Sequence, residues 1–319
     1  MSAVDTVFAV KHKNEEIRVA SRSGGVFTAL SDVIIENGGV VYGCALDKEF
    51  TAIHKRAETK EQRDEFRGSK YVQSKIGNTF KLVEQDLKTG RFVLYSGTPC
   101  QIHGLINFLE LKNIDTKKLL TVDILCHGVP SPQIWKDFLS NNFDVQNIEK
   151  VNFRDKKNFG WRDHVETITV NGKEISSKDY TNAFYSHLIL RQSCFTCHYK
   201  NKQRISDITI GDYWKIEDND KSFDDNKGVS LVIVNTKQGK KFFEQCHESC
   251  IIKEFPISTS IQTAMDHNYQ EPILRKNFWT EYNGNNLSEL TEKYTAPPPL
   301  PLYKRFLIKC IQIISRILK

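Results

Sequence analysis

The chain has 319 residues, with 45 Lys and Arg against 39 Asp and Glu and a formal net charge of +6. This length is enough for one large domain or two unequal ones with a real core. The charge excess is modest and the two signs are interspersed, so nucleic-acid binding is not expected. No run of about eighteen uncharged apolar residues occurs, so a membrane-spanning helix is not expected either.

The first predicted elements are a helix and a strand that follow a glycine-rich turn. The turn SRSGG, from Ser21 to Gly25, precedes apolar residues at helical spacing up to Ile34, and the segment 37–39 (NGG) ends this helix before an apolar strand over 40–46. The turn could cradle a phosphate, because glycines let the backbone approach and the helix start offers free N–H groups. A plain helix N-cap explains the same serines.

Two further units run from a strand through a loop into a helix. The strand over 91–96 is followed by the loop 97–100, and the strand over 119–125 is followed by the loop 126–130 and a helix with Pro132 in its first turn. Repeated alternation of this kind predicts an α/β fold whose parallel strands are flanked by helices.

Beyond residue 150 the pattern changes. The segment 151–180 is strand-like and interrupted, with Asn171 and Gly172 as a hairpin turn, and 205–210 and 229–235 are further strands. We therefore expect an α/β fold with a mixed, largely parallel sheet flanked by helices and a smaller strand-containing region after a boundary near residue 150.

The C-terminal segment has a pattern of its own. After a proline cluster at 297–301, which is typical of a stiff spacer, residues 303–319 have an apolar face and a basic face. This amphipathic, basic helix suits contact with an anionic membrane surface and equally suits docking on its own domain or on a second copy of the chain.

Eight cysteines without a leading apolar signal segment favour a reducing compartment, so we expect a cytoplasmic protein. Cys194 and Cys197 form a C-x-x-C motif that can grip a metal from a tight loop, and Cys100 and Cys126 follow predicted strands. If those strands are parallel neighbours, the sulfurs of Cys100 and Cys126 emerge at one edge of the sheet, and four thiolates could converge there. Such a set fits structural zinc or an iron–sulfur cluster, whereas Cys100 and Cys126 can also be explained as small buried apolar residues.

Two more segments have candidate binding groups. The segment from Arg67 to Tyr71 places a cation, a hydroxyl and an aromatic ring together, which suits an anionic planar cofactor and equally a solvated loop. Asp212 ends a predicted strand beside Tyr213 and Trp214, where its carboxylate could orient a ligand or only shape the turn.

Six motifs occur together in a fixed order: SGGVFTAL from Ser23, GSKYVQS from Gly68, GTPCQ from Gly97, DILCHGVPS from Asp123, RQSCFTC over 191–197 and DITIGDYW from Asp207. As a set they resemble the coenzyme F420 hydrogenase/dehydrogenase beta-subunit family. The resemblance covers roughly three quarters of the chain. It implies an oxidoreductase that passes electrons from a ferredoxin-type donor through a 4Fe–4S cluster and FAD to an organic substrate.

The resemblance also implies site residues. The cluster ligands would be Cys100, Cys126, Cys194 and Cys197. By their positions, His127 and Asp212 are candidate catalytic residues, and His127 can also be explained as a histidine packed against the cluster loop. The flavin contacts would be Ser23, Gly24, Gly25, Val26, Thr28, Ser69, Lys70, Tyr71, Gly97 and Thr98. Residues 1–150 would form the flavin-binding region, 151–295 the cluster-binding region and 296–319 the spacer and amphipathic helix.

Partners follow from the same resemblance. Many relatives have an N-terminal ferredoxin-like module that this sequence lacks, so the expected donor is a separate ferredoxin or partner subunit. Short relatives are associated with surface-polysaccharide assembly, which suggests a sugar or another organic substrate and a location at the inner face of the cell membrane. A homo-oligomer is one option for the assembly. Two other functions stay open: a zinc-stabilised scaffold of a glycan-assembly complex, and a sugar-modifying transferase without redox chemistry.

Overall fold

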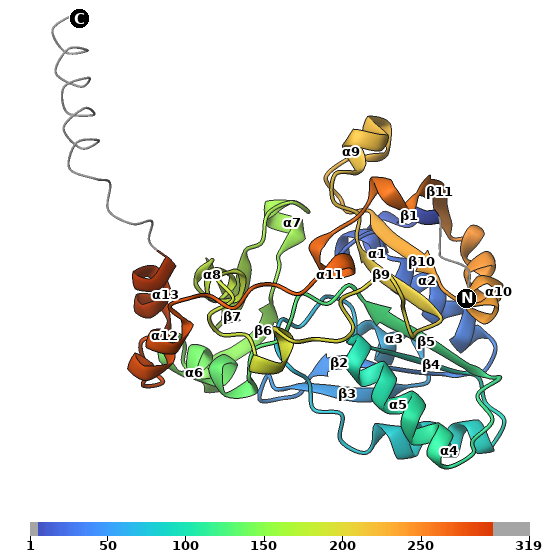
Figure 1. Cartoon of the computed structure of the whole chain (residues 1–319), viewed down its shortest axis with the longest axis horizontal. Coiled ribbons are helices and arrows are strands. Elements are labelled where there is room, and N and C mark those ends of the chain that lie inside the picture. Colours follow the sequence, from blue (N-terminus) through green and yellow to red (C-terminus); the bar gives the residue numbers. More distant parts are fainter. Residues whose placement is uncertain (1–5, 296–319) are drawn as a thin grey trace, which may run out of the picture.

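The computed structural model describes residues 6–295, and its centre is an eight-stranded sheet with the order β11-β1-β10-β9-β5-β4-β2-β3 (Figure 1). Strands β9, β5, β4 and β2 run parallel to one another, and the strands on both sides of them are antiparallel. The mixed α/β fold predicted from the sequence is thereby confirmed. The strands are β1 (Thr6–His12), β2 (Val40–Leu46), β3 (Ala52–Ala57), β4 (Val93–Gly97), β5 (Leu119–Ile124), β9 (Ile208–Asp212), β10 (Ser230–Val234) and β11 (Cys250–Pro256).

Alternate residues of the central strands face two different layers of helices. Val41 and Leu94 pack against α2 (Val26–Glu36) and α10 (Lys237–Glu244), whereas their neighbours Val40 and Val93 pack against α4 (Thr79–Lys88) and α5 (Pro99–Leu111). This is the period of two that a strand imposes, and it buries both faces of the sheet.

A second sheet contains β6 (Ile148–Asn152), β7 (Glu166–Val170) and β8 (Lys173–Ser177). Asn171 and Gly172 join β7 to β8 with φ angles of 49° and 72°, the conformation predicted for this dipeptide. A separate apolar core lies among this sheet, α6 (Pro132–Asn142), α8 (Asp179–Tyr185), α12 (Arg275–Glu281) and α13 (Leu287–Thr295). Figure 1 shows these elements together on one side of the main sheet.

The chain returns to the main sheet after the small one, because β9, β10 and β11 all follow β8 in sequence. The main sheet thus takes strands from both sides of residue 150, and the three-part division of the chain stays a prediction. The remaining helices are α1 (Glu15–Ala20), α3 (Lys60–Asp64), α7 (Lys156–Phe159), α9 (Ile216–Asn219) and α11 (Thr263–Asp266).

The proline cluster and the amphipathic segment predicted at 296–319 lie outside the described residues. Among the helices of residues 6–295, none has both the length and the apolar character needed to cross a bilayer.

Candidate functional site

Two of the four expected ligand cysteines follow neighbouring strands of the main sheet. β4 and β5 are parallel, with Gly97 opposite Asp123, so their carboxyl ends meet at one edge. Cys100 lies in the first turn of α5, which begins after β4 with a capping box, and Cys126 lies in the loop after β5. Both thiols therefore emerge at the edge of the sheet where α/β proteins place ligands.

The C-x-x-C loop is joined to the same edge. Pro130 and Leu190 form an isolated β-bridge, which brings the loop of Cys194 against the loop of Cys126. Gly128 lies at this contact with φ of 136°, and a β-carbon there would lie 2.9 Å from Leu190 and 3.4 Å from the Cβ atom of Cys194. Only glycine allows the two loops to approach so closely.

Burial and neighbouring thiols change the ionisation of Cys126 and Cys194. Burial, followed by the neighbouring Cys100 and Cys194, raises the pKa of Cys126 to about 12. Burial also raises the pKa of Cys194, with Cys197 and Cys100 adding to the effect. Cys100 is exposed and the other three thiols are partly buried. The fold thus brings the four cysteines together, with Cys100 outermost.

The donor set agrees in kind with an iron–sulfur cluster. Within residues 6–295, no three Cys, His, Asp or Glu side chains form a group that could hold one metal ion. A four-iron cluster does not require such a group, because each of its four thiolates binds a different iron atom. Four thiols from three loops, two of them from a C-x-x-C motif, are donors that such a cluster takes.

A buried ion pair lies behind the cysteine loops. Arg204 Nη2 is 2.8 Å from Asp123 Oδ2, and the two side chains are 2% and 0% exposed. Arg204 also donates to the carbonyl oxygens of Tyr199 and Ile124, at 3.0 and 3.3 Å. The pair therefore joins the segment after Cys197 to the end of β5, just before Cys126.

A cluster of aromatic rings begins beside the cysteines at His127. Ring centroids are 5.2 Å apart for His127 and Tyr185, 5.1 Å for Tyr185 and His164, and 4.5 Å for His164 and Tyr71. Burial raises the pKa of Tyr71, and Arg22 of the turn SRSGG opposes that rise. The rings thus connect the cysteine loops with the turn SRSGG.

His127, a candidate catalytic residue, is enclosed by other rings. Its Nε2 is 2.7 Å from His187 Nε2, and Tyr269 packs on its ring at 4.1 Å between centroids. Burial, then His187 and Lys200, lower the pKa of His127 to about 3, so the imidazole is neutral near pH 7. Its catalytic role stays a prediction.

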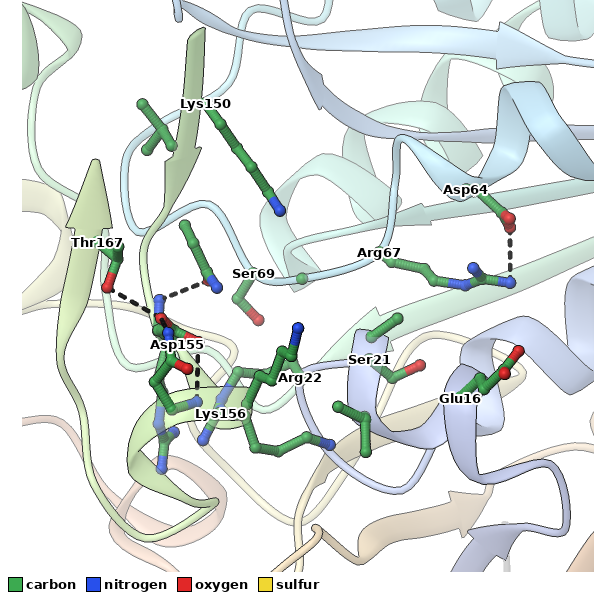
Figure 2. A pocket seen from close by; sticks show the side chains of 18 of the residues that line it. Glu16, Ser21, Arg22, Asp64, Arg67, Ser69, Lys150, Asp155, Lys156 and Thr167 are labelled. Atoms are coloured by element: carbon green, nitrogen blue, oxygen red, sulfur yellow. Dashed lines mark hydrogen bonds and ion pairs between the residues drawn. The ribbon is translucent and has the colours of Figure 1, made fainter. Parts of the chain in front are cut away.

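A cavity of about 700 Å³ opens beside the turn SRSGG, of which Ser21 and Arg22 contribute to its lining. Figure 2 shows Lys150 from β6, Ser69 and Arg22 extending toward its middle from three segments. Its cationic lining residues are Arg22, Arg67, Lys150, Arg154, Lys156 and Lys157, and its acidic ones are Glu15, Glu16, Asp64, Asp155 and Glu174. The volume lies within the range of small-molecule and cofactor sites.

Several of the cavity's carboxylates already have partners. Asp64 pairs with Arg67 at 2.7 Å, and Asp155 accepts hydrogen bonds from Thr167 and from the backbone of Asn158. By contrast, Lys150 makes no ion pair with any residue in the described part of the chain. Lys150 is thus a cation of the lining that an anionic group of a ligand could pair with.

Asp212, the other candidate catalytic residue, orients two arginines of this region. Its carboxylate accepts hydrogen bonds from Trp161 Nε1 at 2.7 Å and from Arg154 Nη1 at 3.2 Å, and lies 3.7 Å from Arg22 Nε. Two guanidinium nitrogens of Arg22, Nε and Nη1, are buried without a hydrogen-bond partner among residues 6–295.

The expected flavin contacts in the turn SRSGG lie beside the cavity rather than on its lining. The Ser23 hydroxyl donates to Val229 O at 2.6 Å, and a β-carbon on Gly24 would lie 2.0 Å from Val10 O. Gly25, Val26 and Thr28 are buried. It is Ser21 and Arg22, at the start of the turn, that line the cavity.

The other expected flavin contacts are divided between the two ends of the site. Ser69 lines the cavity, while Lys70 donates to the carbonyl oxygens of Glu65 and Arg67. Tyr71 belongs to the aromatic cluster. Gly97 and Thr98 lie at the cysteine end instead, where the Thr98 hydroxyl is 3.1 Å from Cys100 Sγ.

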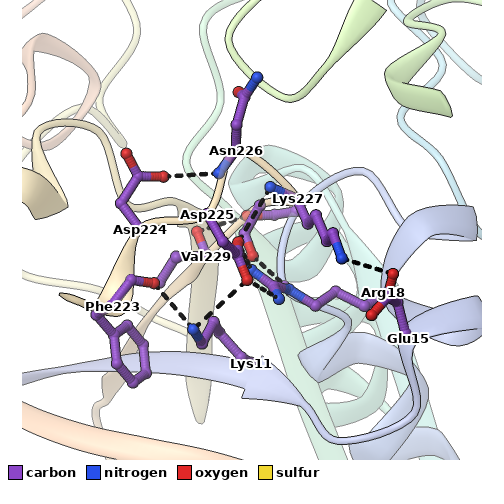
Figure 3. A network of polar contacts seen from close by, with 12 residues as sticks. Lys11, Glu15, Arg18, Phe223, Asp224, Asp225, Asn226, Lys227 and Val229 are labelled. Atoms are coloured by element: carbon purple, nitrogen blue, oxygen red, sulfur yellow. Dashed lines mark hydrogen bonds and ion pairs between the residues drawn. The ribbon is translucent and has the colours of Figure 1, made fainter. Parts of the chain in front are cut away.

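A polar network fixes the turn from behind (Figure 3). Arg18 of α1 pairs with Asp225, and Lys11 donates to Phe223 O at 3.0 Å. Next to this network, Lys156 Nζ donates to the carbonyl oxygens of Ser23 and Lys227, both at 2.8 Å. The turn is thus tied to the loop 223–229 before β10.

We compared the sequence and the fold of the chain with those of known proteins. Residues 90–260, more than half of the chain, match the family model that describes the C-terminal part of the coenzyme F420 hydrogenase/dehydrogenase beta subunit. The chain belongs to this family. A chain of the F420-reducing [NiFe] hydrogenase complex from Methanosarcina barkeri has the same fold, with a TM-score of 0.55, 18% identity and coverage of 91% of this chain and 90% of that one. No curated protein sequence matches.

Family membership makes the chain a redox protein of the oxidoreductase class. The F420 hydrogenase/dehydrogenase match includes all four cysteines and the Arg204–Asp123 pair, whereas the turn SRSGG and Ser69 precede it. The sequence motifs did not reveal Lys150 and Lys157, because these residues join the cavity only through the docking of the small sheet. The signal closest to them was the NFRD motif at 152–155.

Proposed function

We propose that this family member is a flavin-dependent iron–sulfur oxidoreductase that passes electrons from a ferredoxin-type donor to an organic substrate. The proposal is supported by one arrangement: Cys100 and Cys126 follow neighbouring parallel strands, the loop of Cys194 packs against the loop of Cys126, and a cavity of cofactor size opens at the turn SRSGG. Thiols at one end and cationic groups at the other are the binding chemistries that a 4Fe–4S cluster and FAD require.

Each group has its own set of binding residues in this proposal. Cys100, Cys126, Cys194 and Cys197 would hold the cluster, and the cavity beside Arg22 and Ser69 would hold FAD. When bound, the cluster supplies one-electron transfer and the flavin supplies hydride transfer.

The protein's own side chains would bind and orient the cofactors and exclude water from them. Lys150 would neutralise phosphate oxygens, because its ammonium group points into the cavity (Figure 2). Asp212 fixes the guanidinium groups of Arg22 and Arg154 before a ligand arrives. The rings between Tyr71 and His127 keep water out of the space between the two ends of the site.

The proposed partners follow the same arrangement. A ferredoxin or donor subunit would approach at Cys100, the exposed cysteine. We further propose a sugar or related organic substrate in surface-polysaccharide biosynthesis, a cytoplasmic location and peripheral contact of residues 303–319 with the inner face of the membrane. Deleting 303–319 should release the protein from anionic liposomes. A full-length chain that never binds them would exclude this contact.

The proposed function is tested by anaerobic purification, an absorption spectrum, and assays of iron, sulfide and flavin. Flavin bands with a broad iron–sulfur shoulder are expected. A colourless protein with stoichiometric zinc would instead indicate the scaffold function. Binding of nucleotide sugars without any redox cofactor would indicate a transferase.

A further inference from the structure

Lys200 is a buried cation three residues after the C-x-x-C motif. Its side chain is only 7% exposed, and its Nζ donates to the carbonyl oxygen of His127 at 2.8 Å. The same Nζ lies over the ring of Tyr269, 4.0 Å from the centroid. The hydrogen bond and the ring therefore hold the ammonium group in one place beside the loop of Cys126.

No carboxylate neutralises this charge in the described part of the chain. Among residues 6–295, Lys200 has no ion pair, whereas the nearby Arg204 is paired with Asp123. The ionisable groups that influence Lys200 are instead three of the four expected ligand thiols: Cys126, Cys197 and Cys194. Burial lowers the pKa of Lys200, and a negative charge on each of these sulfurs raises it.

We propose that Lys200 is a positioning residue that sets the reduction potential of the cluster through its fixed positive charge. This inference rests on the proposed function, because it requires a cluster on the four cysteines. A cluster with four thiolate ligands gains negative charge on reduction, and a cation beside it stabilises the reduced form more than the oxidised form. Since Lys200 is buried, water and salt screen this interaction weakly.

Two substitutions test the charge of Lys200 separately from the space that its side chain fills and from its hydrogen bond. Lys200→Met keeps the length of the side chain and removes the charge, whereas Lys200→Arg keeps the charge and the ability to donate to His127 O. A merely structural role would change the amount of cluster bound, not the potential of the clusters that are present. Lys202 provides the control, because it is exposed and its nearest carboxylate is Asp266 at 3.8 Å.

The experiment is an anaerobic redox titration of the cluster in the full-length protein, followed by electron paramagnetic resonance, with iron and sulfide assays on each variant. Lys200→Met should lower the midpoint potential of the cluster. At a fixed solution potential the ratio of reduced to oxidised cluster should be at least tenfold smaller, which for one electron corresponds to a shift of about 59 mV. Lys200→Arg and Lys202→Met should match the wild type.

Two results would overturn the inference while leaving the proposed function intact. In the first, wild type and Lys200→Met both hold the cluster at the same potential. In the second, Lys200→Met and Lys200→Gln both fail to assemble a cluster, which assigns the residue to assembly. A wild-type protein without iron and sulfide is a different outcome, because it refutes the proposed function itself.

Discussion

The Arg204 guanidinium lies 2.8 Å from the Asp123 carboxylate, and the two side chains are almost completely excluded from solvent behind the cysteine loops. Burial raises the pKa of Asp123, and Arg204 opposes that shift. Replacing Arg204 with Met leaves a buried carboxylate without its cation. We expect a loss of about 3–5 kcal/mol in the free energy of unfolding, measured by urea denaturation.

The double variant Arg204→Met with Asp123→Asn is the matched control, because it removes both charges. It should be more stable than Arg204→Met alone. An exposed pair, Lys178 with Asp163, calibrates the comparison, and Lys178→Ala should change stability by less than about 1 kcal/mol. Equal losses for the single and the double variant would show that the ion pair is not the cause.

Gly128→Ala should disrupt the meeting of the cysteine loops. The new β-carbon would lie 2.9 Å from Leu190 and 3.4 Å from Cys194 Cβ, at a φ of 136° that other residues rarely adopt. We expect lower iron content and a stability loss of about 1–3 kcal/mol. Gly172→Ala is the control, since its φ is also positive but its β-carbon meets open space. Full iron binding by Gly128→Ala would contradict the close contact of the loops.

The regular part of the fold could be predicted from local pattern. Strand, loop and helix units around β4 and β5 follow from apolar runs that end in Gly97 or Cys126, and their parallel pairing brings Cys100 and Cys126 to one edge. The hairpin at Asn171 and Gly172 follows from the conformations that this dipeptide adopts. The elements themselves depend on neighbours in sequence, so one chain is enough to predict them, whereas the pairing of β4 with β5 was only a condition until the structure showed it.

The cavity could not be predicted, because it depends on how distant segments dock. Lys150 reaches it only because the small sheet packs opposite the turn SRSGG. Gly24 shows why flavin contacts are hard to predict from a glycine-rich turn. A glycine is needed where the backbone approaches a phosphate and equally where it approaches a strand, and the sequence does not distinguish the two cases. Here a β-carbon on Gly24 would meet Val10 O. Flavin contact by residues 23–28 therefore stays a prediction.

Cys194→Ala tests the ligand assignment. Removing one of four thiolates should abolish or strongly reduce bound iron and sulfide after anaerobic reconstitution, because the cluster loses a terminal ligand. Cys44→Ala is the control: Cys44 lies in β2, packs against the apolar core around α6 and α8, and should leave iron unchanged. Unchanged iron in Cys194→Ala would show that the assignment is wrong.

Lys156 should make stability depend on pH in the alkaline range. Burial, then Arg22 and Arg18, lower its pKa in the folded chain to about 7, against 10.5 for a free lysine. Between these two values the unfolded chain binds more protons, so the free energy of unfolding rises with pH, by at most about 1.4 kcal/mol per unit for this group. Lys156→Met removes this contribution, and its stability should rise less steeply than that of the wild type.

The measurement is urea denaturation at several pH values across this window. Lys157→Met is the control, because Lys157 is exposed and should follow the wild-type curve. The carbonyl oxygens of Ser23 and Lys227 accept from Lys156 Nζ and favour the ammonium form, so they oppose the effect of burial. If the free energy of unfolding rises equally with pH in wild type and in Lys156→Met, the prediction is wrong. The carbonyl acceptors would then keep Lys156 charged over the whole pH range, and a cation would hold the turn SRSGG throughout.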